Sequence, residues 1–111
     1  MDFVKRAISE GYAFDLLFVT AGSPENCCSR IHERVLAGGH DVPREKVFSR
    51  YKRTMNYLHE YLSISDKANV FDNSGKHVIL VLTKRDGKFT LSKGAESIEW
   101  VKEYILPYFR F

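Results

Sequence analysis

The paired glycines Gly38 and Gly39 divide the middle of this chain into two amphipathic helices. The first helix begins at Ser23-Pro24, because serine supplies an N-cap oxygen and proline suits the first helical position. It ends at the glycines, since glycine tolerates the left-handed backbone of a helix terminus. The second helix begins at Pro43. The chain is therefore expected to fold back on itself here as two packed helices.

The spacing of apolar side chains supports both helices. In the first helix, the side chains expected to be buried are Cys28, Ile31 and Val35. In the second, apolar residues recur at spacings of four and three, which places them along one face. They are Val47, Tyr51, Met55, Leu58 and Leu62.

Segments of strand length lie on both sides of the helix pair. Phe14 to Val19 is a mostly apolar run, typical of a strand buried on both faces of a parallel sheet. Residues 68–71 form a second short strand, which ends at the turn cluster 72–75. Residues 77–83 and 88–91 form a hairpin around Asp86-Gly87, a favoured tight-turn pair.

Helices are expected at both ends of the chain. Residues 2–10 have an amphipathic pattern closed by Gly11, and residues 95–108 place Ile98, Val101, Ile105 and Tyr108 on one helical face. The element order predicts one domain over residues 1–111. Its predicted fold is a layered α/β domain with a short parallel sheet plus an antiparallel hairpin.

Composition and charge narrow the class of protein. Of the 111 residues, 44% are hydrophobic, which is typical of a folded domain. The net charge of +3 is only mildly basic, so nucleic-acid binding is not favoured. The adjacent Cys27 and Cys28 cannot pair without strain, which indicates a reducing, cytoplasmic setting. The apolar runs are too short to span a bilayer, and no Cys/His pattern has zinc-ligand spacing.

Basic side chains gather around the corner between the two central helices. Arg30 and Arg34 are four residues apart and share one helix face. Lys46, Arg50 and Arg53 form a second stripe on the next helix. If the helices fold back on each other, the two stripes can converge on one pocket.

Such a pocket would suit a phosphate group. Guanidinium groups donate paired hydrogen bonds to phosphate oxygens, and the start of the helix at Pro43 favours an anion. His40, at the corner, is a candidate to donate to the phosphate or to hold the turn. Two other interpretations stay open: a solvated helix face, and a basic surface that contacts nucleic-acid phosphates without a stacking or groove-reading motif.

A longer pattern runs from the first strand through this corner to the second strand. Its parts are Phe18-Val19, Ser23-Pro24-Glu25, Arg30, Glu33-Arg34-Val35-Leu36-Ala37-Gly38-Gly39-His40-Asp41-Val42-Pro43, Arg50-Tyr51 and Phe71-Asp72-Asn73-Ser74-Gly75. In this pattern the chain resembles the zeta-toxin-like P-loop kinase family, which includes predicted ABC-type ATPases.

The resemblance implies an α/β phosphotransferase that uses ATP and magnesium. The best-known zeta toxins phosphorylate a nucleotide-activated amino sugar used in cell-wall synthesis, and an antitoxin neutralises them. Lid arginines of the family contact ATP phosphates. Carried over by position, Arg34 is the first phosphate-binding candidate, and Arg30, His40 and Arg50 are further candidates.

The sequence lacks the motif that a P-loop kinase needs. A P-loop reads Gly-x-x-x-x-Gly-Lys-Ser/Thr, and the Gly-Lys pairs at 75–76 and 87–88 have neither the earlier glycine nor the following hydroxyl residue. The resemblance therefore predicts the C-terminal portion of a P-loop kinase-like fold. On this hypothesis the chain is a non-catalytic fragment with a partial phosphate-binding lid and no cofactor or metal of its own.

Two alternatives for function stay open. The chain could be half of a split kinase that a P-loop partner chain activates. It could also be a stand-alone module that binds a protein, such as an antitoxin, or nucleic acid. Because a missing half would leave a sheet edge uncovered, we expect a homo-oligomer or pairing with that P-loop half.

Overall fold

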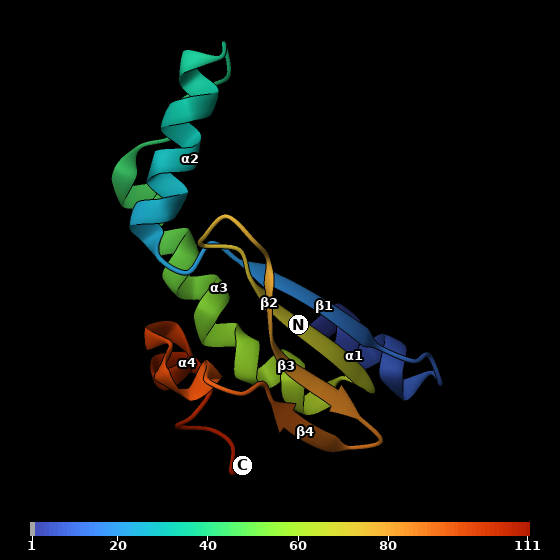
Figure 1. The fold of residues 1–111 in the computed structure, drawn as a ribbon. Coiled ribbons are helices and arrows are strands. Elements are labelled where there is room, and N and C mark those ends of the chain that lie inside the picture. Colours follow the sequence, from blue (N-terminus) through green and yellow to red (C-terminus); the bar gives the residue numbers. More distant parts are fainter. Residues whose placement is uncertain (1) are drawn as a thin grey trace.

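The computed structural model describes residues 2–111. Figure 1 shows helices packed beside one sheet, with α2 and the first turns of α3 projecting beyond it. No helix in residues 2–111 is long and apolar enough to cross a membrane. In chain order the elements are α1 (Asp2–Ser9), β1 (Asp15–Thr20), α2 (Pro24–Leu36), α3 (Arg44–Ile64), β2 (Lys67–Asp72), β3 (Ile79–Arg85), β4 (Lys88–Leu91), the 3₁₀ helix η1 (Ala95–Ser97) and α4 (Glu99–Tyr104).

The strands form one sheet in the order β1-β2-β3-β4. β1 and β2 run parallel, with Asp15 opposite Lys67 and Thr20 opposite Asp72. The pairs β2–β3 and β3–β4 are antiparallel. A parallel pair needs a long crossover, which α2 and α3 supply. The structure thus confirms the predicted layered α/β domain with a short parallel sheet and an antiparallel hairpin.

The hairpin between β3 and β4 turns where the sequence predicts. Asp86 and Gly87 have φ angles of 51° and 75°. Two successive residues with positive φ make the tight turn that matches the twist of paired strands. The register places Arg85 opposite Lys88, on either side of that turn.

Strand β1 lies at the edge of the sheet and is covered on one face only. Leu16 and Phe18 pack against the core. Leu17 and Val19, on the other face, are 69% and 52% exposed. The prediction that this run is buried on both faces is therefore wrong. An apolar sequence permits such burial, but no element of residues 2–111 covers this side of the strand.

The predicted apolar stripe of α3 forms the middle of the core. Val47, Met55, Leu58 and Leu62 are buried, and Tyr51 is half-buried. They pack with the inward-facing residues of the sheet and with α4, and the result confirms the predicted stripe. The remaining buried core residues are Ala68, Val70, Val81, Leu82, Ala95, Trp100, Val101, Tyr104 and Ile105.

Helix α2 starts as predicted but is buried less than predicted. The Ser23 hydroxyl accepts a hydrogen bond from the Asn26 amide at 3.1 Å, which confirms the N-cap. Cys28, Ile31 and Val35 are only half-buried. The reason is visible in Figure 1, where α2 packs along α3 and its far end projects away from the sheet.

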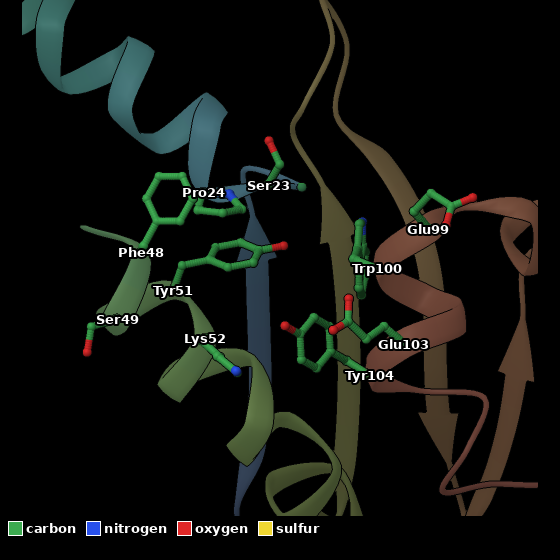
Figure 2. A pocket seen from close by; sticks show the side chains of 11 residues that line it. Ser23, Pro24, Phe48, Ser49, Tyr51, Lys52, Glu99, Trp100, Glu103 and Tyr104 are labelled. Atoms are coloured by element: carbon green, nitrogen blue, oxygen red, sulfur yellow. The ribbon is translucent and has the colours of Figure 1, made fainter. Parts of the chain in front are cut away.

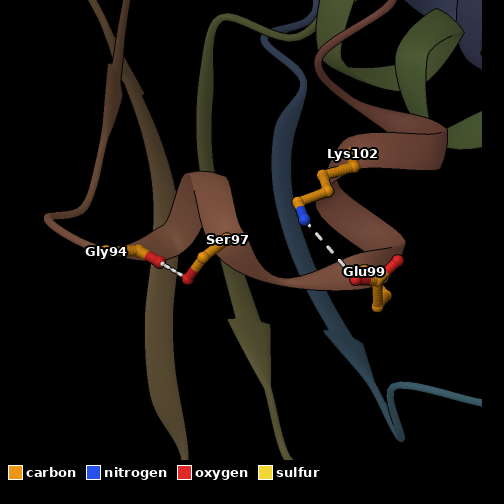
Figure 3. Close-up of polar contacts among 4 residues, drawn as sticks. All are labelled: Gly94, Ser97, Glu99 and Lys102. Carbon is orange, nitrogen blue, oxygen red and sulfur yellow. Dashed lines mark hydrogen bonds and ion pairs between the residues drawn. The ribbon is translucent and has the colours of Figure 1, made fainter.

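The C-terminal helix is shorter than the sequence pattern predicts. It divides into η1 and α4 because Ile98 has an extended backbone, and α4 ends before Pro107. The Ser97 hydroxyl donates to the Gly94 carbonyl at 2.7 Å and holds η1 (Figure 3). Tyr108 is half-exposed, contrary to the predicted helical face.

Candidate functional site

The carboxyl ends of the two parallel strands meet at Thr20 and Asp72, which are register partners. Both side chains are buried. The Asp72 carboxylate accepts hydrogen bonds from the Trp100 indole nitrogen and from the Ser74 amide, each at 2.7 Å. Open α/β sheets bind ligands at the carboxyl ends of their strands. These residues therefore mark the edge of the sheet where a site is expected.

The Asp72 carboxyl is ionised and fully engaged. Burial by itself would raise its pKa, but the hydrogen bonds from Ser74 and Trp100 and the nearby Arg30 charge outweigh burial. The net effect places the pKa below its ordinary value. Asp72, the last residue of β2, thus anchors the Trp100 ring.

A cleft of about 490 Å³ opens beside these strand ends. It lies between the start of α2, the first turns of α3 and helix α4, as Figure 2 shows. Its polar groups include Ser23, Lys52 and Glu103, and its aromatic walls are Phe48, Tyr51, Trp100 and Tyr104. This size, with mostly apolar walls and a few polar groups, is typical of a small-molecule site.

Sequence reasoning did not single out the residues that α4 contributes to the cleft. Trp100 and Tyr104 are four residues apart, so a helix would place them on one face. That spacing could have indicated an aromatic face. Nothing in the C-terminal sequence, however, indicates that this face meets the start of α2.

The phenol of Tyr51 has an unusually high pKa. Burial raises it, the neighbouring Thr20 hydroxyl lowers it, and nearby groups that include Glu103 raise it further, to about 12. Tyr51 is therefore a neutral hydroxyl group at the cleft throughout the physiological range.

We expect the Tyr51 phenol to ionise at a higher pH than an ordinary tyrosine. Because the folded state favours its neutral form, Tyr51 contributes stability below pH 10 that is lost as the pH rises through about 12. An ultraviolet titration of phenolate should show a late step that Tyr51→Phe removes. Tyr12→Phe, at a side chain that is 67% exposed, should leave that step in place.

The structure places the four predicted phosphate-binding residues in different surroundings. Arg30 is half-buried and its guanidinium donates to the Asn73 carbonyl. Arg50 is exposed on α3 and lines a second cleft of about 270 Å³ between α2 and α3. Arg34 and His40 are exposed at the end of α2 and in the loop after it. Arg30 thus reaches the turn after β2, and Arg50 lines the same cleft as Thr20 at the end of β1. The hydrogen bonds described for residues 2–111 join no two of the four side chains.

The glycine pair at the corner is explained by how α2 ends. Gly38 has a φ angle of 100°, a conformation that favours glycine. The Gly39 amide donates to the Arg34 carbonyl at 2.7 Å, and a Cβ atom on Gly39 would lie 3.0 Å from that oxygen. The Asp41 carboxylate accepts from the Val42 amide in the same loop at 2.8 Å. Backbone hydrogen bonds therefore hold this corner, and His40 is left to solvent.

Metal-ligating side chains do not gather in the part of the chain that the structure describes. Among residues 2–111, no three His, Cys, Asp or Glu side chains are placed to hold one ion.

Comparison with other proteins assigns no family to this chain. No family model, no curated protein and no solved structure matches it.

Proposed function

We propose that this chain is the C-terminal half of a zeta-toxin-like ATP-dependent phosphotransferase, with a partial phosphate-binding lid and no catalysis of its own. The motif around Gly38-Gly39 and His40 supports the family, and the missing Gly-x-x-x-x-Gly-Lys-Ser/Thr supports the loss of catalysis. In this proposal the P-loop, the ATP and the magnesium belong to another half. Arg34 and Arg50 would contact phosphates that the other half holds.

The observation that carries this proposal is the free edge of β1. The Phe14 and Thr20 carbonyls accept hydrogen bonds from the segment containing β2. Backbone groups alternate in direction along a strand, so those of Asp15, Leu17 and Val19 point away from β2. The strand contains no proline, glycine or lysine, which are residues that protect natural sheet edges. An unprotected edge beside exposed apolar side chains is suited to accept a further strand.

The exposure of the basic corner is consistent with a lid. Arg34 and His40 extend into solvent beyond the body of the sheet, and Arg50 lies on the exposed side of α3. An arginine in this position stabilises charge only on a ligand that other groups hold in place. The corner therefore fits the role of closing over a nucleotide bound elsewhere.

Two alternatives follow from the same features. The β1 edge equally suits a split kinase in which a separately encoded P-loop half restores activity. The exposed Lys46 and Arg53, which take part in no ion pair described for residues 2–111, favour instead a module that binds an acidic partner. Binding that falls steeply with salt and requires Lys46 and Arg53, but not Arg34, would favour the module.

Nucleotide binding and oligomeric mass test the proposal. We expect the purified chain to transfer no phosphate and to bind ATP weakly, without dependence on magnesium. Arg34→Ala should weaken this binding about three- to tenfold, because one exposed charge contact is lost. Arg53→Ala is the matched control and should have little effect. Micromolar, magnesium-dependent ATP binding that Arg34→Ala abolishes would overturn the non-catalytic proposal, as would phosphate transfer by the chain alone.

A further inference from the structure

Two opposite charges face each other across the strand-end cleft without pairing. Lys52 extends from α3 and Glu103 from α4, and Figure 2 shows both heads directed towards the space between these helices. Neither side chain takes part in an ion pair described for residues 2–111. Glu99, the other carboxylate at the cleft, is paired with Lys102 at 3.5 Å (Figure 3). The cleft thus offers, on opposite walls, one ammonium group and one carboxylate that take part in no ion pair described for residues 2–111.

The Tyr104 hydroxyl adds a polar group to the wall of the cleft, beside the Glu103 carboxylate. Tyr104 is 7% exposed, and its hydroxyl points into the cleft in Figure 2. Burial, the charge on Glu103 and a hydrogen bond with the Glu103 side chain raise the pKa of the phenol, so it stays neutral. A ligand that carries an acceptor can compete with Glu103 for this hydroxyl.

Aromatic rings supply the remaining walls. Phe48, Tyr51 and Trp100 line the cleft beside the charged groups, and Trp100 is fixed by its hydrogen bond to Asp72. Fixed rings present an apolar surface at low entropic cost, and they favour contact with another ring. The volume of about 490 Å³ lies within the range of pockets that bind small molecules.

The charges of Lys52, Glu99 and Glu103 favour one class of ligand over others. A phosphate group would meet one cation, Lys52, and two carboxylates, Glu99 and Glu103. A simple amine would be repelled by Lys52, and a simple acid by Glu103. A molecule that carries an ammonium group and a carboxylate satisfies both walls at once.

We propose that this cleft binds a small zwitterion of the amino-acid class with an apolar or aromatic side chain. Its carboxylate meets Lys52 and the Tyr104 hydroxyl, its ammonium group meets Glu103, and its side chain packs against the aromatic walls. The proposal is independent of the phosphotransferase fragment proposed above, because none of these contacts involves the basic corner.

The test uses the only tryptophan of the chain, Trp100, as a fluorescent reporter. L-Phenylalanine is the probe, and phenethylamine and 3-phenylpropionate are its matched analogues that lack the carboxylate and the ammonium group. We expect a saturable change with L-phenylalanine and affinities at least about fivefold lower for both analogues. The absence of a saturable change, or equal affinity for all three compounds, would overturn the proposal.

Variants that remove the charge of Lys52 or Glu103 test which ligand group each of these side chains contacts. Lys52→Gln should remove the preference for L-phenylalanine over phenethylamine, and Glu103→Gln the preference over 3-phenylpropionate. Both side chains are exposed, so each variant should fold, and far-ultraviolet circular dichroism checks this. Lys46→Gln, on the same helix outside the cleft, is the control and should bind as the unaltered chain does. Unchanged preferences in both cleft variants would contradict the assigned contacts.

Discussion

Replacing Asp72 with alanine is expected to destabilise the fold by about 2–4 kcal/mol, because two hydrogen bonds to a buried carboxylate are lost. The Trp100 indole and the Ser74 amide would each lose their acceptor. Chemical denaturation measures the change in unfolding free energy, and Trp100 fluorescence should shift to longer wavelength as the ring loosens. Asp72→Asn should cost about half as much, since an amide oxygen replaces only one of the two acceptors.

The Asp72 carboxyl is also expected to make the unfolding free energy depend on pH. Its pKa is lower in the folded state than its ordinary value of 3.8, so its contribution is present above that pH. The contribution is lost as the pH falls through the folded-state pKa. Unfolding free energy should therefore decrease less on acidification in Asp72→Asn than in the unaltered chain. Asp15→Asn, at an exposed position of β1, serves as the control, and an equal pH dependence in all three proteins would contradict the assignment.

Replacing Lys84 with methionine is expected to cost about 2 kcal/mol, because the carbonyl groups at the end of α3 lose their donor. The Lys84 ammonium donates to the carbonyls of Leu62, Ser63 and Ser65 at 2.9, 3.3 and 2.6 Å. A cation here also interacts favourably with the helix dipole. Burial lowers the pKa of Lys84, and methionine removes that burial cost, which limits the net loss.

The control for Lys84 is on the neighbouring strand. Lys88→Met replaces an exposed lysine of the same hairpin and should change the unfolding free energy by no more than about 0.5 kcal/mol. Urea denaturation of the two variants measures the difference. If Lys84→Met and Lys88→Met have equal unfolding free energies, the three hydrogen bonds from Lys84 to backbone carbonyls do not stabilise the fold.

Local patterns in the sequence were sufficient to predict most of the helices and strands. The apolar spacing of α3 predicted its buried face, and Ser23 and Asp86-Gly87 predicted a helix start and a tight turn. These features depend on neighbours along the chain, which the sequence displays directly. The C-terminal helix was predicted too long, because the extended backbone at Ile98 depends on how η1 packs against the core.

The candidate site was harder to predict than the fold. The sequence predicted that the stripe of Arg30 and Arg34 can converge with the stripe of Lys46, Arg50 and Arg53. In the structure, Arg30 contacts the Asn73 carbonyl, Arg50 lines a separate cleft with Thr20, and Arg34 is exposed at the end of α2. It also gave no indication that Lys52 and Glu103 face one cleft. Such juxtapositions depend on how helices pack in space, and periodicity within one helix carries no information about its neighbours.

Strand β1, the helix pair and Trp100 show what local sequence determines and what only tertiary packing decides. The sequence by itself determined that residues 14–19 form an apolar strand and that Gly38-Gly39 separates two helices, because both follow from local backbone and side-chain preferences. Only the tertiary structure decided that β1 lies at an open edge, that Leu17 is exposed and that Trp100 reaches Asp72. These outcomes required the packing of segments far apart in the chain, since burial and long-range hydrogen bonds are properties of the assembled fold.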